Sequence, residues 1–86
     1  MTLIITQDST SKNGRYIEIT DGKQTAQIWH GEAYTSVRVV RDQNRNFGTG
    51  GKVFHDGNRF EQALSAYKSS AVRSMLSLAK SLVESV

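Results

Sequence analysis

Three turn-forming pairs, spaced almost evenly through the first half of the chain, constrain its fold more than any other feature. Asn13-Gly14, Asp21-Gly22 and His30-Gly31 separate short segments rich in β-branched and aromatic residues. Asn-Gly and Asp-Gly favour the positive φ angles of tight hairpins. The segments read TLIIT, RYIEIT, QTAQIW, YTSVRVV and, after a glycine-rich corner, KVF. The pattern predicts a curved antiparallel β-meander of four to five strands, in which residues 2–6 supply the optional fifth.

Apolar residues recur at helical spacing in the rest of the chain, after a candidate N-cap at Asp56 or Asn58. A first stripe contains Phe60, Ala63, Leu64 and Tyr67, and a second contains Val72, Met75, Leu76, Ala79, Leu82 and Val83. On one straight helix the stripe centres would differ by about 90°. The sequence therefore predicts one long helix or two consecutive helices with a break near residues 68–71.

Strands followed by helices indicate the α+β class. We expect a single domain over residues 1–86, with the sheet in 1–55 and the helical region in 57–86. The second apolar stripe is too wide to remain in water on a monomer. It should be buried on the sheet or across a two-fold axis, and we assign its six residues to a dimer interface.

Alternation along the predicted strands separates two faces of the sheet. The apolar face contains Ile17, Ile19, Ala26, Ile28, Val37 and Val39. The opposite face contains Tyr16, Glu18, Thr25, Gln27, Trp29, Tyr34, Ser36, Arg38 and Val40. Because aromatic residues and an arginine are unusual on an exposed sheet face, this second face is the candidate binding surface.

Composition narrows the class of protein. The chain has 86 residues, no cysteine and a net charge of +3, and residues 38–60 hold five cationic side chains against two carboxylates. A local basic excess is typical of polyanion binders, although solubility explains a charge of this size equally well. The first apolar run, LII, is too short for a signal or membrane segment. We expect a cytoplasmic protein, in a nucleoid or a phage-infected host cell, that contacts no membrane.

We find no catalytic or cofactor motif in the sequence. The glycine-rich stretch NFGTGGKVFHDGNRFEQAL fails the nucleotide-loop patterns, because Asn46 and Val53 stand where a Walker loop needs a glycine and a hydroxyl residue. His30 and His55 are more simply turn residues than metal ligands, since two further ligands are missing. We therefore predict no enzyme activity, no cofactor and no metal.

Two residues have a structural and a functional interpretation. Trp29 is either a packing residue or a platform on which unpaired bases stack. Lys52 is either a backbone-phosphate contact or a solvated lysine at a sheet edge. The neighbours of Trp29 on its face, Tyr16, Gln27 and Arg38, favour the stacking interpretation.

The order of elements and the stretch GGKVFHDGNRFEQAL resemble the single-stranded-DNA-binding domain of the transcriptional coactivator positive cofactor four and its phage and bacterial relatives. In that family a four-stranded curved sheet and one helix form homodimers that bind single-stranded DNA. Gly51 and Lys52 match the family's glycine-lysine corner, and Phe60 matches the aromatic residue that packs on the sheet. The segment QTAQIWHGEAYTSVRVVRD resembles the central hairpin, which implies DNA contacts at Trp29, Arg38 and Arg41.

The sequence thus predicts a homodimer that binds single-stranded DNA without sequence preference, in replication, recombination or coactivator-like transcription, alongside proteins of those processes. The alternative is a dimeric protein-interaction module that does not bind nucleic acid. The candidate DNA contacts are Trp29, Arg38, Arg41, Lys52, Tyr16, Tyr34, Arg45, Phe47 and Lys23. If the basic residues between Arg38 and Arg59 lie scattered over the molecule, the alternative gains.

Overall fold

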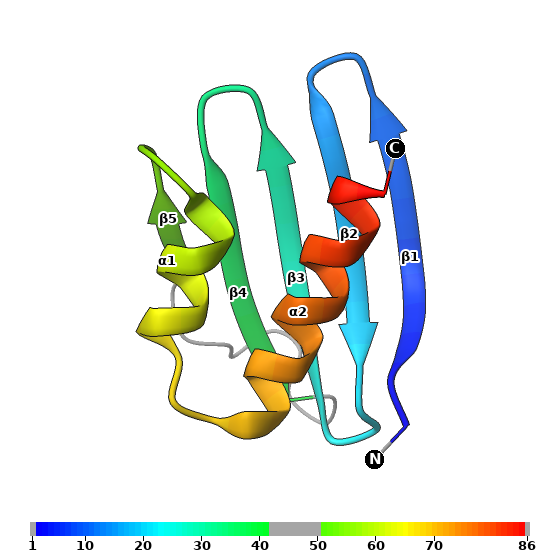
Figure 1. Cartoon of the computed structure of the whole chain (residues 1–86). Coiled ribbons are helices and arrows are strands. Elements are labelled where there is room, and N and C mark those ends of the chain that lie inside the picture. The colour runs from blue at the N-terminus through cyan, green and yellow to red at the C-terminus, as the bar shows by residue number, and fades with distance from the viewer. Residues whose placement is uncertain (1, 42–50, 86) are drawn as a thin grey trace.

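The structure, a computed structural model, describes residues 2–41 and 51–85. Within them, five strands form one antiparallel sheet in sequence order, β1-β2-β3-β4-β5. The strands are β1 (Ile4–Ser11), β2 (Gly14–Thr20), β3 (Gln24–Gly31), β4 (Thr35–Arg41) and β5 (Lys52–Phe54). Helices α1 (Arg59–Ala66) and α2 (Ser70–Glu84) follow and lie on one face of the sheet (Figure 1). The predicted α+β class is confirmed, with the N-terminal segment as a fifth strand.

The turn between β2 and β3 forms as the sequence predicts. The Asp21 carboxylate accepts hydrogen bonds from the backbone N–H groups of Lys23 and Gln24 at 2.8 and 2.9 Å, and Gly22 has a φ of 95°. The prediction of a positive φ at Gly14 is wrong. Among the described residues, the glycines with positive φ are Gly22 and Gly57. Gly14 instead begins β2.

The helical region breaks in two at residues 67–69, which overlap the break predicted near residues 68–71. Asn58 caps α1 by accepting the N–H of Glu61, and Ser69 caps α2 by accepting the N–H of Val72. This second N-cap starts a new helix, so the two apolar stripes no longer share one axis. Each stripe can then face the sheet.

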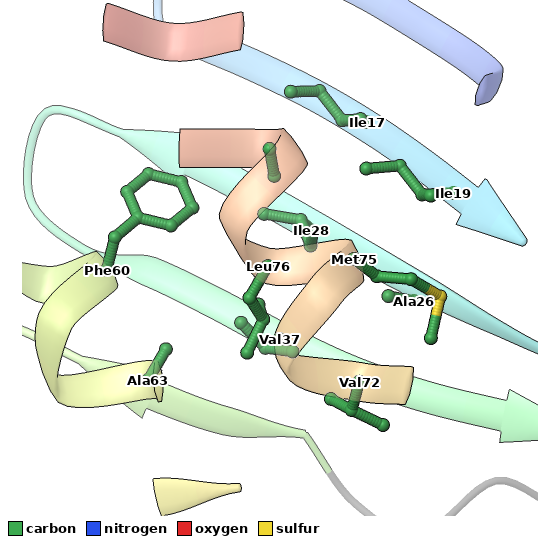
Figure 2. Packing of buried hydrophobic residues seen from close by; sticks show 11 residues of the cluster. Ile17, Ile19, Ala26, Ile28, Val37, Phe60, Ala63, Val72, Met75 and Leu76 are labelled. Carbon is green, nitrogen blue, oxygen red and sulfur yellow. The ribbon is translucent and has the colours of Figure 1, made fainter. Parts of the chain in front are cut away.

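The core lies between the sheet and the two helices (Figure 2). α1 packs on β4 and β5, and α2 packs on β2 and β3. The core cluster consists of Ile17, Ile19, Ala26, Ile28, Val37, Phe60, Ala63, Val72, Met75, Leu76 and Ala79. The predicted apolar face of the sheet therefore supplies one half of the core, and Phe60 packs on the sheet as the resemblance implied.

The α2 stripe requires a correction. Val72, Met75, Leu76 and Ala79 are buried against the chain's own sheet, and Leu82 and Val83 pack half-buried beside them. Side chains already covered within one chain are not available to a second copy. The assignment of Val72, Met75, Leu76 and Ala79 to a dimer interface was therefore wrong, because the break before α2 lets the stripe reach β2 and β3. Leu82 and Val83 keep some exposed surface, and for them the assignment stays a prediction.

β1 stands at the edge of the sheet, beyond the part covered by α2 (Figure 1), and all eight of its residues are exposed. A bulge between Ile5 and Gln7 interrupts its pairing with β2. Arg15 of β2 ties β1 to the helix layer: its guanidinium donates to the Asp8 carboxylate at 2.7 and 2.8 Å and to the Leu82 carbonyl at 2.9 Å. Hydrogen bonds, and not apolar contacts, hold this edge.

Candidate nucleic-acid interface

The face of the sheet opposite the helices, which we call the open face, carries an aromatic pair. Tyr16 of β2 is the direct cross-strand partner of Trp29 of β3, and Ser36 of β4 continues the same row. Side chains of directly paired residues lie close enough to touch. Tyr16, Trp29 and Ser36 are each half-buried, so the row is partly accessible to a ligand.

Trp29 owes its position to two glycines. Gly14 and Gly31 are partners in the β2–β3 register and share the face of Trp29. A Cβ added to Gly31 would come 2.7 Å from the indole Nε1, and one added to Gly14 would come 2.7 Å from Cζ2. The indole therefore lies across the backbone of both glycines. An indole held against the sheet loses little side-chain freedom when a base stacks on it.

The next row of the open face is polar and joined by hydrogen bonds. Glu18, Gln27 and Arg38 follow one another across β2, β3 and β4. One carboxylate oxygen of Glu18 accepts from the Tyr16 hydroxyl at 2.9 Å and from the Gln27 amide at 3.1 Å. These bonds orient the Tyr16 ring beside Trp29. They also place one negative charge in the row of Arg38, with Gln27 between the two.

The third row is closed on β3 and β4. Thr25 and Val40, a cross-strand pair on the open face, are only 1% exposed each. The row is open at its β1 end, where Ile4 is 55% exposed. On β3 and β4 the accessible part of this face is thus the aromatic row and the polar row.

Lys52 points away from this patch. It pairs with Val37 and shares its side of the sheet. Its ammonium lies 4.7 Å from the centre of the Tyr67 ring and donates to the Ala66 carbonyl at 3.4 Å, at the end of α1. Lys52 and Arg38 therefore lie on opposite faces, although we predicted that both contact one strand of DNA.

The other candidates are spread over the molecule. Lys23, in the β2–β3 turn, and Arg41, at the end of β4, are exposed at one end of the sheet, since Arg41 pairs with Gln24. Tyr34 is exposed in the β3–β4 turn at the opposite end, with its ring 6.2 Å from that of His55. Arg45 and Phe47 lie outside the described residues. Of the nine predicted contacts, the structure brings Tyr16, Trp29 and Arg38 together.

Charge is nevertheless unevenly distributed along the strands. The end with the β2–β3 turn and the α1–α2 connection (Figure 1) is the basic end, defined by Lys23, Arg41, Lys52, Lys68 and Arg73. Within the described residues, the carboxylate at this end is Asp21. Toward the other end, Glu32, Asp56, Glu61 and Glu84 are balanced by Lys12, Arg15, Arg59 and Lys80. Arg38 lies one row nearer the basic end than Trp29. Phosphates approaching the open face are therefore drawn toward its Arg38 side.

Both histidines lie away from the patch. His30 is half-buried on the helix side, where its Nδ1 lies 2.7 Å from the Thr35 hydroxyl and its ring lies 5.2 Å from that of Phe60. Burial, and then the charge of Arg59, lower the pKa of His30. Across residues 2–41 and 51–85, no three His, Asp or Glu side chains are grouped to hold a metal ion.

The chain matches no protein-family model, and no curated protein or solved structure is significantly similar to it. The resemblance to the positive cofactor four domain therefore stays a prediction. Among the described helices, none is long and apolar enough to cross a membrane.

The glycine pair beneath Trp29 was not predicted. The turn pairs predict turn positions for Gly14 and Gly31, but each lies two positions from an aromatic residue of the open face, Tyr16 or Trp29. Positions two apart on a strand share a face. That spacing was the available signal for a tryptophan lying over bare backbone.

Proposed function

We propose that the protein binds single-stranded DNA without sequence preference through the open face of its sheet, as a homodimer acting in replication, recombination or transcription. The observation that carries the proposal is the direct pairing of Tyr16 with Trp29 on a helix-free face, with Arg38 in the adjoining row. Bases stack on aromatic rings whatever their identity, and an adjacent arginine neutralises a phosphate. The Tyr16 hydroxyl and the Gln27 amide already donate to Glu18, which leaves fewer groups to read base edges and favours binding that ignores sequence.

The positions of the charged residues indicate how single-stranded DNA would lie on the open face. Arg38 lies between the aromatic pair and the basic end, where Lys23 and Arg41 are exposed. Three phosphate contacts give a slope of about −2 for log affinity against log salt concentration, at about 0.7 per contact. A surface that also contacted phosphate through Lys52 would give a steeper slope.

The test is a titration of fluorescent oligothymidylate and of duplex DNA at several salt concentrations. We expect preference for the single strand and a slope near −2. Arg38→Gln should weaken binding and flatten the slope by about 0.7, whereas Lys52→Gln, on the opposite face, should leave both unchanged. Equal losses in the two variants would rule out the open face as the binding surface.

Glu18 offers a test in the other direction. Its carboxylate lies in the row of Arg38 and repels phosphate, so Glu18→Gln should strengthen binding by up to about 1 kcal/mol. The amide oxygen of glutamine can still accept from Tyr16 and Gln27, which keeps the aromatic pair oriented. Weaker binding by this variant would contradict the assigned path of the phosphates.

The homodimer needs a surface other than the buried part of α2, and β1 is the one we propose. Ile4 and Ile5 are 55% and 41% exposed on an edge strand, and exposed edge strands readily pair with another chain. Light scattering should give twice the mass of the chain for the wild type and a single-chain mass for Ile5→Lys. Val53→Lys, at the other edge of the sheet, is the matched control and should remain dimeric. A wild type with the single-chain mass would eliminate the homodimer.

One observation favours the alternative, a protein-interaction module. Arg38 lies on the open face, Lys52 on the helix side, and Arg59 at the end away from Arg41, so the basic residues of this segment are scattered. The same titration separates the two functions. Salt-independent or absent binding of oligothymidylate would leave the module as the better proposal.

A further inference from the structure

A pocket of about 540 Å³ opens at the end of the sheet opposite the basic end. Four segments meet there: the β1–β2 turn, the end of β3, the first residue of α1 and the last turn of α2. Its volume falls in the range of small-molecule sites. The pocket lies outside the Tyr16–Trp29 patch, but Gly14 and Gly31 form part of both, since the indole covers the same backbone that lines the pocket.

The charged groups that line the pocket are mostly cationic. Lys12, Arg15 and Arg59 face it together with one carboxylate, Glu32. The guanidinium of Arg15 is already bound to Asp8 and to a helix carbonyl. The cationic groups left for a ligand are therefore Lys12 and Arg59, which come from the β1–β2 turn and the start of α1.

Arg59 is held in place without losing its charge. One of its terminal nitrogens donates to the Gly31 carbonyl at 2.8 Å, and a neutral carbonyl positions the guanidinium but does not neutralise it. The lowered pKa of His30, which also lines the pocket, partly reflects the positive charge of Arg59. A fixed arginine with unused donors is the usual means of binding a phosphate.

We infer that this pocket binds a phosphomonoester of nucleotide size, whose phosphate is held between Arg59 and Lys12. The volume exceeds what a bare phosphate needs, so it can also hold a sugar or a base. Such a group is available as a free nucleotide or as the phosphorylated end of a DNA strand. The inference does not depend on the open-face proposal, because Trp29 and Arg38 do not line the pocket.

The test uses the whole chain labelled with ¹⁵N and follows the amide signals of Gly31 and Arg59. Titration with thymidine 5′-monophosphate should shift both signals, with a weaker effect from inorganic phosphate and none from thymidine. Arg59→Gln and Lys12→Gln should each weaken the nucleotide about tenfold, the loss of one hydrogen bond between charged groups. Lys68→Gln, at the basic end, should leave its affinity unchanged.

Glu32→Gln is a second kind of variant, which keeps the test informative if Arg59→Gln or Lys12→Gln does not fold. The substitution removes the one carboxylate that lines the pocket and touches no core residue, so nucleotide binding should become about threefold tighter. No signal shift at saturating nucleotide, or equal affinity in the wild type and in the Lys12 and Glu32 variants, would overturn the inference.

Oligothymidylates with and without a 5′-phosphate distinguish the two sources of the ligand. If a strand end is the ligand, the phosphorylated oligomer should bind more tightly, and Lys12→Gln should abolish the difference. If a free nucleotide is the ligand, the two oligomers should bind alike while thymidine 5′-monophosphate still shifts Gly31. Loss of oligomer binding in Trp29→Ala, with nucleotide binding retained, would show that the two surfaces act separately.

Discussion

The two faces of the sheet are made by alternate residues of the same strands, yet they differ in burial and in chemical character. On the helix side Ile28 is fully buried under α2, whereas its neighbour Trp29 lies half-buried on the open face. The helix side holds apolar groups that stabilise the fold. The open face holds rings, a carboxylate and an arginine that contribute little to stability and can meet a ligand. A substitution on one face should therefore change one property and leave the other largely intact.

The largest expected effect is on the helix side. Leu76→Ala removes a fully buried side chain from the centre of the core and should lower the free energy of unfolding by about 2–5 kcal/mol. Urea denaturation measures this loss. Ser77→Ala, the next and exposed residue of α2, should change stability by less than about 0.5 kcal/mol. A small loss for Leu76→Ala would mean that α2 does not form the core.

Next in size is the replacement of the tryptophan on the open face. Trp29→Ala should cost about 1–3 kcal/mol of affinity for oligothymidylate, while thermal stability changes little. The wild-type fluorescence should be quenched by the oligomer. Ile28→Val, one residue earlier and on the other face, should do the reverse: a loss of about 0.5–1.5 kcal/mol in stability and none in affinity. If Trp29→Ala unfolds the chain, Trp29 is a packing residue and the comparison of faces fails.

A subtler change displaces the indole without removing it. In Gly31→Ala the new Cβ meets the Trp29 ring at 2.7 Å, and the other close contacts are atoms of the same ring. Affinity for oligothymidylate should fall by about 1 kcal/mol, less than for the loss of the stack, with a change in tryptophan fluorescence before any DNA is added. Gly14→Ala is the contrasting variant, because its Cβ would also meet the His30 carbonyl at 2.6 Å and should destabilise the strand pair. Unchanged emission in Gly31→Ala would contradict the contact between indole and glycine.

The smallest expected effect concerns β1, the edge strand that lies beyond α2. The hydrogen bonds from Arg15 hold the pKa of Asp8 below its ordinary value of 3.8. A carboxylate with a lowered pKa stabilises the fold above its unfolded pKa, and this stabilisation is lost as pH falls through the folded value. Asp8→Asn should thus lower the free energy of unfolding by at most about 1 kcal/mol at neutral pH. The variant should also lose less stability than the wild type when the pH falls below 3.8. Ser9→Ala, on the opposite side of β1, should keep the wild-type pH profile.

The period of two and the turn chemistry were enough to predict the strands and the division of the sheet into faces. Ile17, Ile28 and Val37 are in the core because alternate positions of a strand face alternate sides, whatever the rest of the chain does. The capping residues Asn58 and Ser69 likewise act over three residues. These features are local, so a single sequence contains the information that determines them.

The side of the sheet on which Lys52 lies was not predictable in the same way. It depends on the register of β5 against β4, which pairs Lys52 with Val37 and turns its side chain toward Tyr67. A shift of one residue would have turned it to the open face. Phe54 packs against the core, and α1 packs on both β4 and β5, so tertiary packing holds this register.

The sequence by itself determined the meander, the two faces and the apolar stripe of α2, because each rests on contacts between residues close along the chain. Tertiary structure alone decided that the stripe covers its own sheet, that the glycines lie beneath Trp29, and that Lys12 and Arg59 meet at one pocket. Each of these joins residues from different strands or helices. Their meeting follows from how the elements pack to bury the apolar face of the sheet, which no local pattern specifies.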